Sequence, residues 1–195
     1  MWPLKVLKSL EFSRITKSRF VRSHMTVDHE PLKTSTLRKV EASMVRYGAE
    51  YVQDILELFK KSHPDLVVHG TCDSIRLHYC HEQDGSCYSN WIRSKWTAKD
   101  SSVETMKKLH FVSLKNNTAA DSSPNIYRLS MFIVSETHEG QQVYLVGEQA
   151  AVIIECDPVL RCPKIEINSG DAPHFIDVRK IQKRVQVIED FDLRY

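Results

Sequence analysis

The hydrophobic pattern of this chain changes its period at His63, and that change limits the folds that the chain can adopt. Over residues 37–62, apolar side chains recur at three- and four-residue steps, which predicts one long amphipathic helix. The helix is expected to end at His63, because the residue before Pro64 avoids helical backbone angles. After Pro64 many apolar residues alternate with polar ones, and this period of two predicts strands.

Two β-hairpins stand out in the second part of the chain. The first is predicted to join residues 74–81 to residues 87–96 through a turn within residues 83–86. The second is predicted to join residues 125–136 to residues 141–155. Because the strands of this second hairpin are in part apolar on both faces, they are expected at the centre of a sheet.

Shorter segments complete the predicted fold. Residues 109–114 and 164–167 are expected to be short strands, and residues 175–190 fit a helix or a strand, with the helix favoured. The fold class is therefore α+β: a long N-terminal helix packed on a curved antiparallel β-meander, either open or closing as a small barrel. Such a barrel is similar to oligonucleotide-binding (OB) barrels, and a cystatin-like or RWD-like sheet wrapped on a helix fits the same order of elements.

A basic arm precedes the helix. Residues 1–26 carry six Lys and Arg side chains against the single acid Glu11. This composition is typical of a mitochondrial presequence, of a basic tail that binds an acidic partner or nucleic acid, or of a peripheral helix, and the pattern leaves all three open. The expected organisation is an arm over residues 1–33, partly disordered or cleavable, followed by a single domain over residues 34–195.

Composition excludes several classes of function. A net charge of +2 on 195 residues is too small to indicate nucleic-acid binding, so any basic site must be local. The six glycines are too dispersed to form a phosphate-binding loop, and no apolar run approaches the roughly 18 residues of a membrane span. Five cysteines, an odd number without a secretory signal, favour reduced thiols in an intracellular protein over a disulfide framework.

The first hairpin carries a surface that core packing does not explain. A two-residue turn at Asp84-Gly85 would pair Arg76 with Arg93 and His78 with Trp91, with Ser74 beside Lys95. Two guanidinium groups facing each other repel, so this face is expected to take an external anion or a nearby carboxylate such as Asp73. The predicted binding residues are Arg76, His78, Trp91, Arg93 and Lys95, with Tyr127 and Arg128 as an extension.

Basic and aromatic side chains on an open strand face match the chemistry of single-strand nucleic-acid platforms, where bases stack on rings and cations contact phosphates. An acidic protein partner would use the same cations. The alternative is a structural role, in which Trp91 is covered by another element and an arginine over it makes an ordinary cation–π contact.

Metal binding and catalysis have weaker support in the sequence. The first hairpin region contains six residues of the types that bind zinc: His69, Cys72, His78, Cys80, His81 and Cys87. They do not occur in the short pairs that zinc sites use. No Gly-x-Ser-x-Gly or His-Glu-x-x-His motif occurs, and strand geometry points Cys80 and His81 to opposite faces. We therefore expect no catalytic residues, no metal and no cofactor.

The sequence thus predicts a non-enzymatic binding module, a subunit of a larger assembly, that engages single-stranded nucleic acid or an acidic protein partner through the basic and aromatic strand face. The alternative is an imported mitochondrial protein that loses a presequence and acts as an assembly or scaffold factor. A small enzyme with its site at the Cys/His-rich hairpin is the third hypothesis. An intracellular location is expected, the nucleus being favoured over the mitochondrial matrix.

Overall fold

The computed structural model describes residues 4–5, 25–33, 37–82, 84–94, 111–115, 125–138, 140–154, 164–167, 171–185 and 187–189. Two short helices precede most of the strands: α2 is Val40–Tyr47 and α3 is Ala49–Ser62. The strands are β1 Leu4–Lys5, β2 Met25–His29, β3 Val67–Cys72, β4 Ser74–His81, β5 Cys87–Arg93, β6 Phe111–Leu114, β7 Ile126–Thr137, β8 Gly140–Ile154, β9 Lys164–Ile167, β10 His174–Asp177, β11 Ile181–Val185 and β12 Ile188–Glu189. A 3₁₀ turn, η2, spans Val178–Lys180.

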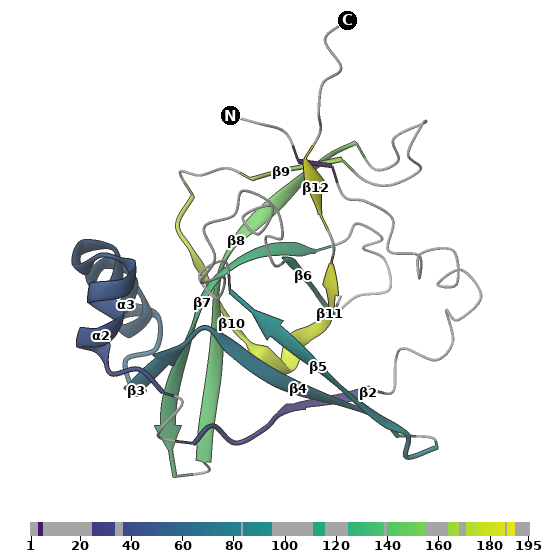
Figure 1. Cartoon of the computed structure of the whole chain (residues 1–195), viewed down its shortest axis with the longest axis horizontal. Coiled ribbons are helices and arrows are strands. Elements are labelled where there is room, and N and C mark those ends of the chain that lie inside the picture. The colour runs from purple at the N-terminus through teal and green to yellow at the C-terminus, as the bar shows by residue number, and fades with distance from the viewer. Residues whose placement is uncertain are drawn as a thin grey trace, which may run out of the picture.

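The strands form two antiparallel sheets (Figure 1). The smaller sheet has three strands in the order β2-β4-β5. The larger sheet has nine strands: the order is β11-β6-β7-β8-β9-β1-β12, β10 pairs with β8, and β3 pairs with β7. The long hairpin β7–β8 is therefore the centre of the larger sheet.

The β7–β8 hairpin is buried on both faces, as its apolar sequence predicts. On one face, Phe132, Val134 and Leu145 pack with residues of the three-stranded sheet, such as Ile75 and Leu77. On the other face, Met131, Ile133 and Val146 pack against α2 and α3 in a separate cluster. The molecule thus has helices, a large sheet and a small sheet as successive layers, and the outside of the small sheet is left uncovered by the described elements (Figure 1).

The predicted α+β fold with a long N-terminal helix is wrong. The chain is mainly β-structure, a strand precedes the helices, and the described strands do not close into a barrel. The expected single helix is divided at Gly48, whose backbone has φ 97°. Glycine reaches this conformation without the steric cost that a side chain imposes, so α2 and α3 pack as two separate segments.

The helix expected over residues 175–190 is also wrong. These residues form β10, the turn η2, β11 and β12. The Asp177 side chain accepts a hydrogen bond from the Arg179 amide, which starts the 3₁₀ turn. That turn lies between two short strands and brings Val178 and Ile181 to the same core. The three-residue spacing of apolar residues therefore comes from a turn between strands and not from an α-helix.

Other predictions about the strands are confirmed. The two hairpins exist, and so do the short strands near residues 109–114 and 164–167. The end of the predicted basic arm is β2, which pairs with β4 along its whole length. Apart from Leu4–Lys5, residues 1–24 lie outside the described part of the chain, so the arm hypotheses stay predictions.

Replacing Gly48 tests whether the break between α2 and α3 is built into the fold. Gly48→Ala is expected to lower the free energy of unfolding by about 1–3 kcal/mol, because alanine is strained at φ 97°. Urea unfolding measures the change, and Glu57→Ala on the exposed side of α3 serves as the control, with a change within about 0.5 kcal/mol. A gain in stability for Gly48→Ala would show that the chain prefers one continuous helix.

Candidate binding face of the small sheet

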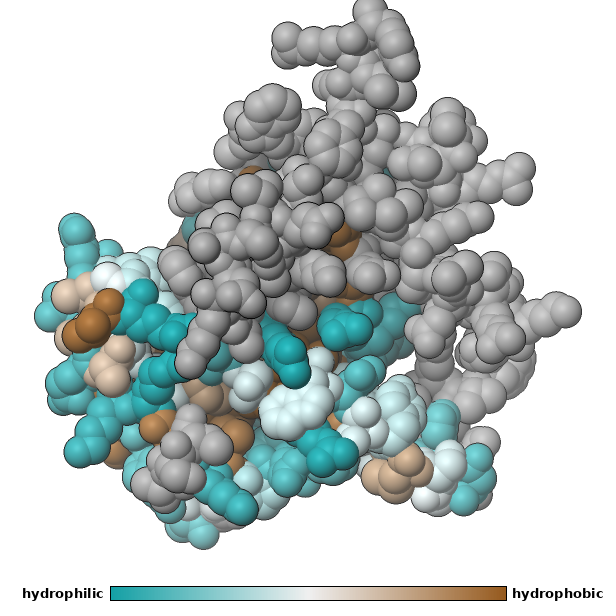
Figure 2. Space-filling model, in the orientation of Figure 1, coloured by the Kyte–Doolittle hydropathy of each residue, from teal (hydrophilic) through white to brown (hydrophobic). Residues whose placement is uncertain are grey.

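The small sheet has one face in the core and one face open to solvent. On β4 and β5 the inward residues Ile75, Leu77 and Ile92 are fully buried. Because side chains alternate along a strand, their neighbours point outward. We call this open side the outer face: Thr26, Asp28, Glu30, Ser74, Arg76, His78, Cys80, Cys87, Ser89, Trp91 and Arg93. In space-filling form, the surface over the β4–β5 hairpin is mostly hydrophilic or neutral in hydropathy (Figure 2).

The strand register places these side chains differently from the sequence prediction. Cys80 lies opposite Cys87, and Tyr79 opposite Tyr88. The turn is longer than the predicted two-residue one: the amide of Gly85, at φ 67°, donates to the His81 carbonyl. The predicted register is therefore wrong by two residues, and an even shift leaves every side chain on its predicted face.

This register separates the two arginines that were expected to face each other. Arg76 lies opposite Trp91, and Arg93 lies opposite Ser74. The predicted repulsion between directly paired guanidinium groups is absent as a result. Arg76, Trp91, Arg93 and His78 nevertheless share the outer face, as they do in the predicted register, because the two registers differ by an even number of residues.

The outer face contains acids as well as bases, because β2 lies beside β4. Glu30 Oε2 is 3.7 Å from Arg76 Nη1 and 4.0 Å from His78 Nε2. Arg76 Nε also donates to Ser89 Oγ at 3.1 Å. Arg76 is thus held by neighbours on both sides.

Asp73, the carboxylate expected to serve this face, lies elsewhere. It is 8% exposed and pairs with Arg38 and with Arg46, whose Nη2 is 3.2 Å away. Two cations around one buried carboxylate fix the region where the helices meet the sheet. Arg93, by contrast, is exposed and makes no hydrogen bond or ion pair with any residue that the structure describes.

Two aromatic rings of β5 are open to solvent. The Trp91 side chain is 47% exposed on the outer face. Tyr88, 48% exposed, points to the other side and stacks on Tyr79 with ring centroids 4.9 Å apart. Burial raises the pKa of the Tyr79 hydroxyl, so that ring stays neutral. Sequence reasoning missed Tyr88 because its inward position near the hairpin tip did not indicate exposure.

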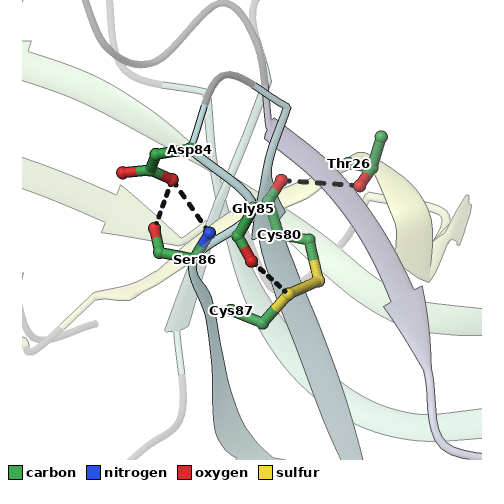
Figure 3. Close-up of a disulfide and its surroundings, with 6 residues drawn as sticks. All are labelled: Thr26, Cys80, Asp84, Gly85, Ser86 and Cys87. Carbon is green, nitrogen blue, oxygen red and sulfur yellow. Dashed lines mark hydrogen bonds between the residues drawn. A yellow bond between two sulfur atoms is a disulfide. The ribbon is translucent and has the colours of Figure 1, made fainter.

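A disulfide between Cys80 and Cys87 joins β4 and β5 next to the turn (Figure 3). The two Cα atoms are 4.2 Å apart, as expected for directly opposed residues without hydrogen bonds between them. Asp84 Oδ1 accepts from the Ser86 amide at 2.9 Å and from Ser86 Oγ, and these bonds lower the pKa of that carboxyl group. The expectation that all cysteines are free thiols is wrong for this pair.

The remaining ligand-type residues do not form a metal site. No group of three His, Cys, Asp or Glu side chains able to hold a metal occurs in the part of the chain that the structure describes. Cys72 is a free, buried cysteine, and burial raises the pKa of its thiol to about 12. His69 lies on β3 within 3.5 Å of Glu136 and apart from the disulfide.

The predicted extension of the site is not brought to the outer face. Tyr127 lies on β7 in the core between the sheets and is only 6% exposed. Arg128 forms an ion pair with Glu148 across β7 and β8. Lys95 lies outside the described residues. Arg76, His78, Trp91 and Arg93 are therefore the predicted residues that the structure gathers on one surface.

Comparisons with other proteins add no assignment to this face. No protein-family model, curated protein or solved structure matches the chain. Among the described helices, none combines the length and the apolar character that crossing a membrane requires.

Removing the disulfide should destabilise the hairpin. The bond closes a short loop, with a sequence separation of 7, and a loop of this size corresponds to about 2–3 kcal/mol of unfolding free energy. Cys80→Ser and Cys87→Ser are each expected to lose that amount in urea unfolding. Reductant should destabilise the wild type by a similar amount and leave the double serine variant unchanged, whereas equal stability of reduced and oxidised protein would contradict the cross-link.

Proposed function

We propose that this chain is a non-enzymatic binding module, a subunit of a larger assembly, that engages an acidic segment of a protein partner through its outer face. The observation that carries the proposal is the pair Trp91 and Arg93 on β5. Both side chains are exposed on the same face, and Arg93 has no partner among the described residues. An aromatic ring beside an uncommitted arginine is the kind of surface that interface cores use.

The geometry supports an anionic ligand near β5. Residues two apart on a strand are separated by about 7 Å, so one residue of an extended ligand can contact the Trp91 ring while the residue two positions along reaches Arg93. A guanidinium binds a carboxylate through two parallel hydrogen bonds, which favours a defined orientation of the ligand. Arg76, opposite Trp91, adds a second positive charge, although it shares that charge with Glu30.

The mixed charge of the outer face favours a protein partner over a nucleic acid. Affinity for nucleic acid grows with the number of phosphates that are neutralised. The described part of the outer face has two arginines and His78 against Asp28 and Glu30. A phosphate chain running across the three strands would pass over both carboxylates, whereas a short acidic segment along β5 avoids them.

Single-stranded nucleic acid is the second candidate, and one observation favours it. The Trp91 ring is half exposed beside Arg76 and Arg93, and a base stacked on such a ring contributes about 1–3 kcal/mol. A contact limited to a few nucleotides at β5 would not meet the carboxylates of β2. This candidate predicts binding of oligonucleotides with little dependence on sequence.

Two substitutions test the proposed face. With a peptide of the repeat Glu-Thr-Val-Thr as the probe, in which Glu and Val lie two residues apart on one face of the extended chain, Trp91→Ala and Arg93→Ala are each expected to weaken binding about tenfold, through lost ring contact and lost charge. Arg93→Ala should also reduce the salt dependence of binding, measured by fluorescence anisotropy between low and physiological salt. Arg184→Ala, an exposed arginine on β11, is the matched control with unchanged affinity.

The same titration decides between the candidates. Tighter binding of oligo(dT) than of the acidic peptide, lost in Trp91→Ala, would select the nucleic-acid candidate. Binding of both probes that neither substitution changes would refute any role of the outer face.

A further inference from the structure

Strand β5 is the last strand of the small sheet, and its far side pairs with no strand among the residues described. The order of that sheet is β2-β4-β5, so β4 occupies one side of β5 only. Seven residues form the strand, Cys87–Arg93, and none is a proline. Natural sheets protect such edges with prolines, bulges, charges or covering segments, because an open edge is a template for another strand.

The register tells which backbone groups face the open side. Near the turn, the His81 amide donates to the Ser86 carbonyl, and beyond the far end of β4 the Ser94 amide donates to the Asp73 carbonyl. Hydrogen-bonded pairs alternate along an antiparallel ladder, so the even-numbered residues of β5 point their N–H and C=O groups to β4. The odd-numbered residues, including Ser89, Trp91 and Arg93, point theirs to the open side.

We infer that the acidic partner segment binds as an added fourth strand along β5, hydrogen-bonded to the outward backbone groups of Ser89, Trp91 and Arg93. This inference rests on the proposed function and specifies how the partner is held. The edge presents donors and acceptors in alternation, which an extended peptide can pair in full. A phosphate chain offers acceptors only, so it leaves the carbonyl groups of β5 without donors.

The side chains of β5 indicate the composition of the added strand. Side chains on the outer face of that strand would lie about 5 Å from those of β5. A carboxylate placed opposite Arg93 gains a charge-assisted bond, and an apolar residue opposite Trp91 covers the ring. Arg93 is the one charged residue in β5, so no acid of this strand opposes the ligand.

The acids of β2 are too distant to prevent this binding. Neighbouring strands are about 4.8 Å apart, which places an added strand roughly 14 Å from β2. Charges at a solvent-exposed surface are screened over about 8 Å at physiological ionic strength. Glu30 and Asp28 therefore weaken the positive potential over β4 more than at the edge of β5.

A proline at position 89 tests strand addition separately from binding to the face. Ser89→Pro removes an outward N–H and leaves the hydrogen bonds between β4 and β5 in place, because Ser89 is a non-hydrogen-bonded residue of that ladder. Ser89→Ala is the matched control, since it also loses the contact of Ser89 Oγ with Arg76 but keeps the N–H. The probe is the same amidated peptide, two Glu-Thr-Val-Thr repeats of about eight residues in all, long enough to span β5.

The expected result is binding about tenfold weaker in Ser89→Pro and within about twofold of wild type in Ser89→Ala. Amide exchange in the wild type should also slow at Ser89, Trp91 and Arg93 when the peptide is added, which tests the inference even if the proline variant does not fold. If the peptide binds Ser89→Pro normally, or leaves those three amides unprotected, strand addition is wrong.

The outcomes separate this inference from the proposed function. If the peptide binds Ser89→Pro normally but no longer binds Trp91→Ala, the proposed binding face is supported and strand addition is wrong. If every variant binds the peptide as the wild type does, both strand addition and the proposed function of the outer face are wrong. A wild-type dimer in sedimentation that Ser89→Pro dissociates would show that a second copy of this chain occupies the edge, which also contradicts the inference.

Discussion

The register of β4 against β5 is the constraint on which the proposed binding surface depends. It is fixed at one end by the disulfide between Cys80 and Cys87 and by the left-handed backbone of Gly85. At the other end, Ile75 and Ile92 lie opposite each other in the core. If β4 kept its place, a shift of β5 by one residue would bury Trp91 and expose Ile92, so core packing and the cross-link stabilise the same arrangement.

The layers of the molecule explain why the outer face is open. The β7–β8 hairpin is apolar on both sides and needs two covers. The helices cover one side, and the small sheet covers the other with its inward residues. Asp73, between β3 and β4, pairs with Arg38 and Arg46 and so links the small sheet to the helix end of the structure. Among the described residues, no further helix or strand packs on the outside of the small sheet.

Local sequence patterns predicted the strands and the side of the sheet to which their residues point. They did not predict the register, the break in the helix or the pairing of strands that are distant in the sequence. Alternation together with a turn of an even number of residues put Arg76 and Trp91 on one face, and the longer turn that forms keeps that parity. The partner of each residue depended on the length of the turn, which the Asp84-Gly85 pair does not determine by itself. Gly48 divided the predicted helix because glycine allows either a helix or a break, and tertiary packing makes that choice. The disulfide could have been predicted only from the correct register of β4 against β5. The pairing of β4 with β2, which brings Glu30 beside Arg76, depends on contacts between residues that are distant in the sequence.

Backbone amide exchange in the free protein reports which residues of β5 face β4 and whether the other edge of β5 is open. We predict slow exchange at Tyr88, Asn90 and Ile92, whose N–H groups face β4, and fast exchange at Ser89, Trp91 and Arg93, whose N–H groups face the open edge. The opposite alternation would show a register that places Trp91 in the core. Uniformly slow exchange along Cys87–Arg93 would show that the edge is already covered.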